Sequence, residues 1–322
     1  MKYKQSQILL LVSLLTLVSC HHSQGVAAKP PQETPTVSPL TPQPEAGVIA
    51  TPLTYKLETY KSQVMGGSRT YGVCLPPGYH KNPQKRYPVI FLLHGGHGDP
   101  TTWFDKQKGQ ALKTLGELYA TGKLPPTIII TPDGNDKRGT SPYWDPQYID
   151  GPQGKVSTAV GDELVKLVQK RYRTLSNPNF WAMGGLSSGG WGALNVGLHN
   201  LQHFSILFSH SGYFHDKSGP QNSPITYIKN IPSSAKKRLR IYLDSGTSDV
   251  EEIAEAQQFS KILHQLKIDH TFREFPGSHT WQYWREHLAD SLTFVGEQFR
   301  DSQVTHATDN VDITKPKNPV SK

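Results

Sequence analysis

The clearest sign of chemistry in the sequence is a serine set between glycines, Ser187 in the pentapeptide Gly185-Leu186-Ser187-Ser188-Gly189. An apolar run at 180–183 precedes it and a helical pattern at 188–199 follows. A sharp strand-to-helix turn presents a serine hydroxyl at the edge of a sheet, and flanking glycines make room for the close-packed backbone. The pentapeptide alone also fits a glycine-rich helix start without chemistry, but its position between a strand and a helix favours a nucleophile.

A serine hydroxyl needs a base to take its proton, and the base needs an acid to orient it. His279 is the candidate base because it lies in a loop between the last strand pattern and the last long helical pattern, 281–299. Asp249 is the candidate acid because it follows a strand pattern and stands between the serine and the histidine in chain order. Its rival, Asp244, lies within or at the end of that strand, and Asp249 also fits a helix cap.

Acyl transfer further needs hydrogen-bond donors for the oxyanion of the transition state. The segment His94-Gly95-Gly96-His97-Gly98 follows a strand pattern, and we expect the N–H of Gly96 or His97 to be one donor and that of Ser188 the other. His94 and His97 could also be interpreted as metal ligands, but no third ligand stands at a recognised spacing. We therefore expect an oxyanion hole at Gly96 and Ser188, no metal site and no cofactor.

Strand and helix patterns alternate through the middle of the chain. Short strand patterns at 55–60 and 70–75, joined by a glycine turn, predict an antiparallel pair. Continuous apolar runs predict strands buried on both faces, as in a parallel sheet, at 89–93, 127–130, 180–183, 204–209, 240–243 and 271–275. Helical patterns lie among them at 110–121, 159–172, 188–199, 250–266 and 281–299. The alternation predicts an α/β fold, with a mostly parallel central sheet and helices on both faces.

Six ordered motifs carry a resemblance to a known family: LLHGGHGD (92–99), TPDG (131–134), GGLSSGGWGAL (184–194), SHSGYF (209–214), LDSGTSD (243–249) and FPGSHTWQYWREHL (275–288). The block 69–299 resembles the bacterial esterase D family, which also holds feruloyl and acetylxylan esterases, formylglutathione hydrolases, enterochelin esterases and mycolyltransferases. The resemblance implies the α/β-hydrolase fold, with Ser187 as nucleophile, Asp249 as acid and His279 as base, and no metal or organic cofactor.

The expected activity is that of a serine carboxylic-ester hydrolase working through an acyl-enzyme. Carbohydrate-linked, feruloyl, acetyl and siderophore esters all fit as substrates. An acyltransferase with the same triad and a non-catalytic, envelope-tethered binding protein are the alternatives. Aromatic rings on loops commonly line such pockets, so His97, Trp103, Trp144 and Trp281 are candidate pocket residues, although Trp281 also fits core packing.

The first twenty residues indicate export. An apolar run at 8–18 follows two lysines and is too short to span a membrane. It ends at Leu17-Val18-Ser19-Cys20, which resembles a bacterial lipobox, so we expect a lipoprotein signal peptide at 1–19 and a lipid on Cys20; an ordinary secretory peptide is the alternative. The proline-rich stretch 20–52 predicts a disordered tether. These features predict a lipid-anchored protein of the bacterial cell envelope, with its catalytic domain, 53–300, outside the cytoplasm.

The remaining signals restrict structure and partners. Residues 301–322 are polar and contain two prolines, which predicts a disordered tail. Cys74 would have no disulfide partner after lipidation, and its apolar neighbours predict a buried thiol. The net charge of +8 comes without a long basic run, so nucleic-acid binding is not indicated. A polyanionic wall or an anionic lipid surface would be a suitable partner for a mildly basic protein. The sequence leaves the oligomeric state open.

Overall fold

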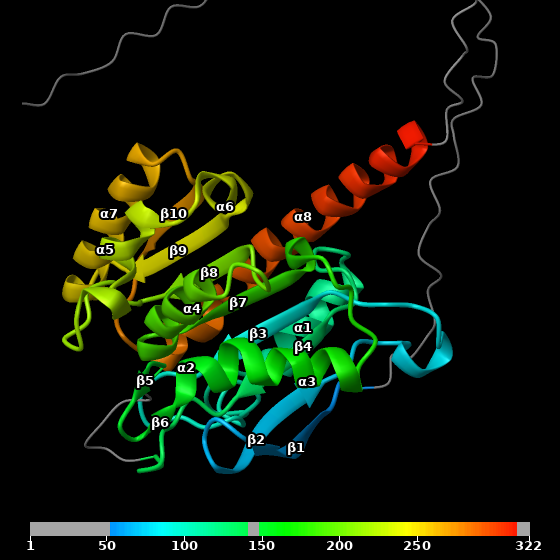
Figure 1. Ribbon diagram of the computed structural model, residues 1–322, viewed down its shortest axis with the longest axis horizontal. Coiled ribbons are helices and arrows are strands. Elements are labelled where there is room, and N and C mark those ends of the chain that lie inside the picture. Colours follow the sequence, from blue (N-terminus) through cyan, green and yellow to red (C-terminus); the bar gives the residue numbers. More distant parts are fainter. Residues whose placement is uncertain (1–51, 141–147, 314–322) are drawn as a thin grey trace, which may run out of the picture. The chain divides into compact units, whose positions relative to one another are not determined.

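The computed structural model of the protein describes residues 52–140 and 148–313, with side chains to residue 304 (Figure 1). The chain divides into two units, 1–48 and 49–322, and all the described residues belong to the second. The predicted signal peptide, Cys20 and nearly all of the tether therefore lie outside the described residues, as do Trp144 and residues 314–322. None of the described helices combines the length and apolar character that crossing a membrane requires.

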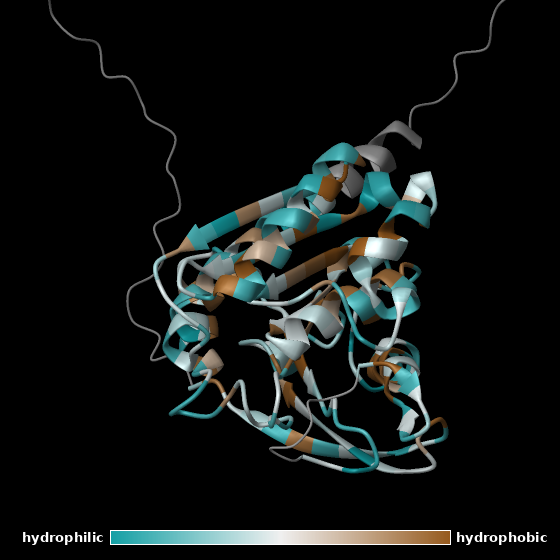
Figure 2. Cartoon of the chain, turned by 90° about the vertical axis from the view of Figure 1, so that its left-hand side faces the viewer, coloured by the Kyte–Doolittle hydropathy of each residue, from teal (hydrophilic) through white to brown (hydrophobic). Residues whose placement is uncertain are grey.

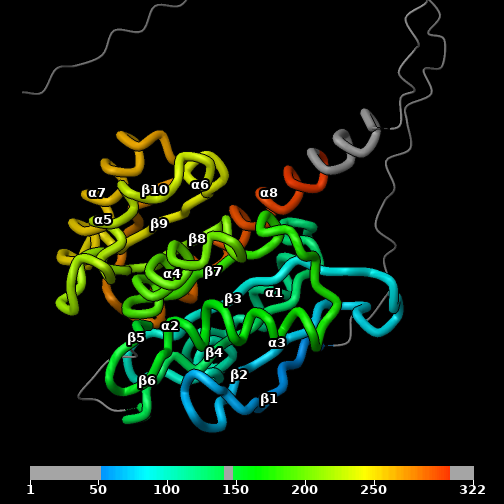
Figure 3. The backbone as a smooth tube through the Cα atoms, viewed as in Figure 1, coloured from blue at the N-terminus to red at the C-terminus, as the bar shows by residue number. Residues whose placement is uncertain are grey.

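Eight strands form one mostly parallel sheet in the order β1-β2-β4-β3-β7-β8-β9-β10. β1 (Tyr55–Ser62) and β2 (Gly67–Cys74) form the predicted antiparallel pair, and β2 joins β4 in antiparallel orientation. All later neighbours are parallel. These strands are β4 (Ile128–Pro132), β3 (Val89–Leu93), β7 (Trp181–Leu186), β8 (Ile206–His210), β9 (Arg240–Gly246) and β10 (Asp269–Phe275). Figure 3 follows the chain from the blue β1–β2 pair at one edge to β10 at the other.

The central strands form the core of the sheet. Every residue of β3, β4, β7 and β8 is buried, because helices cover both faces of these strands. The apolar colouring in Figure 2 accordingly follows the interior strands. This arrangement confirms the predicted fold and places the carboxyl ends of all the parallel strands along one edge of the sheet.

Two layers of helices enclose this sheet. α1 (Ala111–Ala120) and α8 (Trp281–Ile313) contact each other behind the sheet in Figure 1, and α3 (Leu164–Arg171) and α4 (Ser188–His199) lie in front of it. α7 (Val250–Gln265) packs on β9 and β10. The long helices thus occupy the predicted segments, within a few residues at most ends.

Several shorter elements were not predicted, because segments of two to six residues show no clear periodicity. They are α2 (Val156–Thr158), the ribbon of β5 (Asp150–Gly151) and β6 (Gly154–Lys155), α5 (Pro224–Tyr227), α6 (Ser233–Arg238), and 3₁₀ turns at Tyr79–Lys81, Pro178–Phe180, Pro220–Asn222 and Ile228–Asn230. The helix predicted over 159–172 begins with a π-helical turn, Ala159–Glu163, before α3.

The predicted tail requires a correction at its start. α8 continues to Ile313, so residues 301–313 are helical and the prediction of a disordered segment from Asp301 is wrong for them. Proline and glycine are absent from 301–313, and extending an existing helix costs far less than nucleating one. Cys74 is buried and free, as predicted, and burial raises the pKa of its thiol to about 12.

Candidate active site

Ser187 occupies a strained turn between β7 and α4. Its backbone angles are φ 54° and ψ −127°, a region that residues other than glycine rarely adopt. The glycines around it are required by close packing: a Cβ on Gly185 would lie 2.5 Å from the carbonyl oxygen of Gly189, and a Cβ on Gly189 would collide with the carbonyl oxygen of His94. The N–H of Ser187 donates to the carbonyl oxygen of His210 at 2.9 Å, which fixes the turn against β8.

His279 and Asp249 meet Ser187 at the carboxyl edge of the sheet. The distance from His279 Nε2 to Ser187 Oγ is 2.9 Å, and that from His279 Nδ1 to Asp249 Oδ2 is 2.8 Å. The buried carboxylate accepts the Nδ1 proton, so Nε2 is free to accept the hydroxyl proton of the serine. The structure thus brings together the three side chains that the sequence proposed, from loops that follow β7, β9 and β10.

The rival acid, Asp244, lies inside β9 and has other partners. Its Oδ2 is 2.7 Å from His210 Nδ1, with both side chains fully buried, and its Oδ1 accepts the hydroxyl of Tyr283 at 3.0 Å. His210 Nε2 in turn lies 2.9 Å from Ser291 Oγ, whose hydroxyl also contacts the carbonyl oxygen of Leu288. This second Ser-His-Asp arrangement has no access to solvent, so it supports the site instead of reacting. The sequence analysis missed it, although His210 lies within the SHSGYF motif.

Glu252 is a further residue that the sequence analysis missed. It lies in the first turn of α7, and its carboxylate, that of Asp249 and the imidazole of His279 have atoms within 4.8 Å of one another. Burial, and next the adjacent Asp249 carboxylate, raise the pKa of Glu252 to about 7. The atom types of this group are those of metal ligands, but Asp249 and His279 use theirs for the hydrogen bond between them.

The glycine-rich loop at 94–98 lies directly beside the nucleophile. A Cβ on Gly95 would be 3.3 Å from the Cβ of Ser187. The buried His94 accepts the N–H of Gly134 at Nε2, 3.0 Å away, so its proton lies on Nδ1 and is donated to the carbonyl oxygen of Gly95. Burial lowers the pKa of His94, which keeps this ring neutral.

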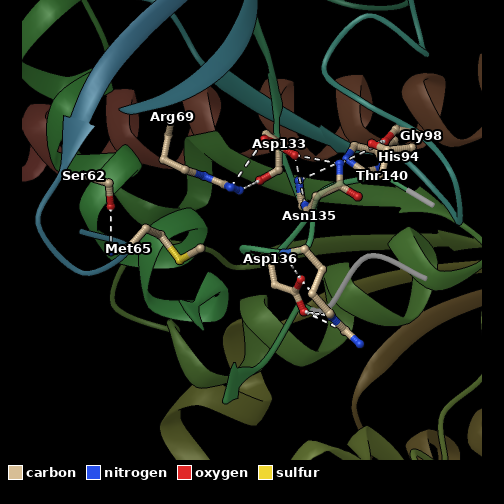
Figure 4. Close-up of polar contacts among 11 residues, drawn as sticks. Ser62, Met65, Arg69, His94, Gly98, Asp133, Asn135, Asp136 and Thr140 are labelled. Carbon is tan, nitrogen blue, oxygen red and sulfur yellow. Dashed lines mark hydrogen bonds and ion pairs between the residues drawn. The ribbon is translucent and has the colours of Figure 1, made fainter. Parts of the chain in front are cut away.

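The loop after β4 holds the other end of the 94–98 segment. Asn135 Nδ2 donates to the carbonyl oxygen of Gly98 at 3.0 Å, and Arg69 forms an ion pair with Asp133 at 3.4 Å (Figure 4). Gly96 and His97 therefore sit on a loop that is anchored at both ends. Gly96 is partly exposed and His97 is exposed with φ 60°, so both main-chain positions stand at the surface near Ser187.

The predicted pocket residues have different environments. Trp103 is only 1% exposed and donates its indole N–H to the carbonyl oxygen of Leu93, so the prediction that it lines a pocket is wrong. Its ring packs edge-to-face on Trp281, with centroids 6.0 Å apart. Trp281 is half-buried and also contacts Trp284, whose ring lies 4.8 Å from that of His279. The three indoles pack in a row next to the imidazole. Trp103 is buried because its ring lies between Trp281 and the main chain of Leu93 at the end of β3.

The fold and the serine-centred site define an α/β serine hydrolase architecture. Comparison with known proteins identifies the family. The profile of the Esterase family, described as putative esterase, matches residues 62–295, and the chain belongs to this family. A solved structure of a ferulic acid esterase superposes with a TM-score of 0.70 at 25% identity, covering 77% of this chain and all of that one.

Two curated relatives show the same relationship in sequence. An endo-1,4-beta-xylanase/feruloyl esterase of Xylanibacter ruminicola is 33% identical over 73% of this chain and 30% of its own length. An esterase of Mycobacterium tuberculosis is 30% identical over 69% of this chain and 55% of its own. The chain thus spans only part of the length of these relatives.

Proposed function

We propose that the protein is a serine carboxylic-ester hydrolase with Ser187 as nucleophile, His279 as general base and Asp249 as the acid that orients it. The observation that carries the proposal is the continuous hydrogen-bonded chain from Ser187 Oγ through the imidazole to Asp249 Oδ2, at 2.9 and 2.8 Å. Membership of the Esterase family supports the same activity.

The geometry suits two-step acyl transfer. Ser187 Oγ attacks the ester carbonyl carbon while His279 Nε2 accepts the hydroxyl proton, and Asp249 stabilises the resulting imidazolium. Collapse of the tetrahedral intermediate breaks the C–O bond, and His279 returns the proton to the departing alcohol. Water then attacks the acyl-enzyme, with His279 again acting first as base and then as acid, and the carboxylic acid leaves.

The N–H groups of Ser188 and Gly96 are the proposed oxyanion donors. Ser188 begins α4, where the first N–H groups have no partner within the helix and carry the positive end of its dipole. Gly96 follows Gly95, which abuts Ser187, so its N–H lies on the adjacent loop. Two main-chain donors on opposite sides of the nucleophile are typical of this type of site.

The proposed substrates are esters of carbohydrates with feruloyl or acetyl groups. The support is the description of similar proteins as feruloyl and acetyl esterases. The half-buried Trp281, which packs on the Trp284 ring next to the imidazole, offers an aromatic surface for such an acyl group, and His97 is the proposed contact on the opposite loop. We further propose that a lipid on Cys20 holds the protein in the bacterial cell envelope, as the segment 1–20 indicates.

Fluorophosphonate labelling followed by peptide mapping tests the site. We expect the probe to modify Ser187, and we expect Ser187→Ala to lose both the label and the hydrolysis of short chromogenic esters. Ser188→Ala, which keeps the proposed main-chain donor, is the matched control and should retain the label. A label on another serine, or full ester hydrolysis by Ser187→Ala, would show that the site is elsewhere.

A further inference from the structure

The two edges of the parallel sheet differ in charge. Six connections lead into the amino-terminal ends of the parallel strands, at 75–88, 121–127, 172–180, 200–205, 228–239 and 266–268, and we call this surface the basic edge. Together these connections contain ten Lys and Arg residues and no Asp or Glu. Seven of the ten lie in two segments, three in 75–88 and four in 228–239. Such a one-sided distribution creates a strong local positive potential.

The opposite edge, which carries Ser187 and His279, lacks this excess. The described parts of the connections that leave the parallel strands there, at 94–110, 133–140, 148–149, 211–223, 247–249 and 276–280, contain six acidic residues and five Lys or Arg. An excess of cations near the catalytic residues would suit an anionic substrate. Because the excess lies at the far ends of the strands, its partner is something other than the molecule bound at Ser187.

Three arginines of the basic edge donate hydrogen bonds to main-chain carbonyl oxygens, which leave their positive charge uncompensated. Arg86 donates to the carbonyl oxygen of Thr174, Arg173 to that of Lys85 and Arg238 to that of Leu201, at 2.9 to 3.2 Å. Beside this edge, among the described residues, Asp269 pairs with Arg240 at 3.2 Å, and both are the first residues of strands. Cations also stabilise the carboxyl ends of helices, but that role does not explain segment 75–88, which follows a strand.

The chain also enters the fold at this edge. Tyr55, the first residue of β1, pairs with Cys74, and Cys74 pairs with Ile129 at the start of β4. Leu53 and Thr54, which directly precede β1, therefore lie beside the basic edge. Residues 1–52 join the fold at this point. α8 reaches the same edge, where Arg300 donates to the carbonyl oxygens of Gly122 and Lys123 (Figure 1).

We propose that the basic edge docks on the anionic headgroups of a phospholipid membrane, so that the carboxyl edge with Ser187 faces away from the lipid. Six adjacent strands span roughly 24 Å from first to last, at about 4.8 Å per spacing, which suits a broad charged surface. A lipid attached near the N-terminus would be connected to the fold through Leu53 and Thr54, which lie at this edge. A lipid and a basic surface acting together give stable membrane binding where one alone is marginal. The proposal does not depend on ester hydrolysis.

Vesicle binding by the full chain tests the proposal. The parent protein is the Cys20→Ala variant, which cannot carry the lipid, and its affinity is measured for phosphatidylcholine vesicles with and without phosphatidylglycerol. The edge variant replaces four exposed lysines of the basic edge by glutamine. The matched control replaces four exposed lysines elsewhere, so that both variants lose the same net charge. The edge set is Lys81, Lys123, Lys237 and Lys267, and the control set is Lys106, Lys137, Lys155 and Lys217.

We expect the parent to prefer phosphatidylglycerol vesicles, and this preference to fall with added salt. The edge variant should bind them about tenfold or more weakly, whereas the control variant should lose about threefold at most, because a basic residue contributes strongly only near the surface. Circular dichroism verifies that both variants are folded. Equal losses in the two variants, or no preference for the anionic vesicles, would overturn the proposal. Tighter binding to soluble polyphosphate than to vesicles at equal phosphate concentration would assign the surface to a polymer instead.

Discussion

Ser187 and His210 are joined through the main chain, since the N–H of the serine donates to the carbonyl oxygen of the histidine at 2.9 Å. The side chain of the same histidine is fully buried 2.7 Å from Asp244. The turn that carries the nucleophile is therefore supported by a buried histidine–aspartate contact, and Asp244 also accepts the hydroxyl of Tyr283, four residues after His279. This contact therefore connects the nucleophile turn, β9 and α8.

We expect His210→Leu to destabilise the protein strongly. The change leaves the Asp244 carboxylate buried without its imidazole partner, and an uncompensated buried carboxylate typically costs about 3–5 kcal/mol. His203→Leu is the matched control, because His203 pairs with Asp162 at the surface, where the side chains are 15% and 31% exposed. Such a pair contributes about 1 kcal/mol or less. Urea unfolding measures both, and equal losses would contradict a structural role for the buried pair.

Substitution of the two aspartates in LDSGTSD should have different effects, one on catalysis and the other on stability. Asp249→Asn should keep its stability but lower kcat by about 10⁴, because the amide no longer holds His279 in the tautomer that accepts the serine proton. Asp244→Asn should lower the free energy of unfolding while its folded fraction keeps most of the activity. Steady-state kinetics and thermal melts distinguish the two variants. A large loss of kcat in Asp244→Asn alone would show that Asp244, and not Asp249, is the catalytic acid.

Glu252 should make both stability and activity depend on pH. Its pKa is raised from 4.5 to about 7 in the folded protein, so between these values the folded state binds the proton more tightly than the unfolded state. By linkage, this group lowers stability as the pH rises through that window. Glu252→Gln removes the titration, so the variant should gain stability relative to the parent between pH 5 and 8, by about 1 kcal/mol since the carboxyl is partly exposed.

The same variant should change the pH profile of catalysis. An ionised Glu252 places negative charge beside His279 and favours the protonated imidazole, which cannot accept the serine proton. Glu252→Gln should therefore shift the acidic limb of kcat/KM to lower pH. Glu251→Gln removes the same charge from an exposed neighbour and is the control. Identical profiles for the two variants would show that Glu252 has no influence on the imidazole.

Gly189 should not tolerate a methyl group. In Gly189→Ala the new Cβ would collide with the main chain of Leu93 and His94, so we expect lost activity together with a lower melting temperature. Gly116 is the matched control, because it lies within α1 with open space around it, and alanine there should stabilise the helix by up to about 1 kcal/mol. A fully active Gly189→Ala would show that the loop and the turn can separate.

The sequence was sufficient for the features that depend on local pattern. Ser187, Asp249 and His279 each follow a strand, and in a parallel sheet all such positions meet at one edge, so their proximity could be predicted from chain order. The antiparallel β1–β2 pair followed from its glycine turn.

Contacts between distant side chains could not be predicted in this way. His210 Nε2 forms a hydrogen bond with Ser291 Oγ although the two residues are 81 positions apart in the chain. The sequence around either residue gives no sign of the other. Trp103 could be placed on a loop, but whether its ring faces solvent or the underside of that loop depends on the packing of Trp281. Glu252 looks like an ordinary residue of a first helical turn until Asp249 and His279 are placed around it.

The outermost position of β10 has a consequence for heat inactivation. β10 pairs with β9 on one side only, and the loop that follows it carries His279. A border strand can detach while the interior strands remain paired, and such partial opening costs less free energy than global unfolding. Warming should thus withdraw the imidazole from Ser187 before the sheet itself melts, so enzymatic half-life and calorimetric transition would be governed by different parts of the molecule.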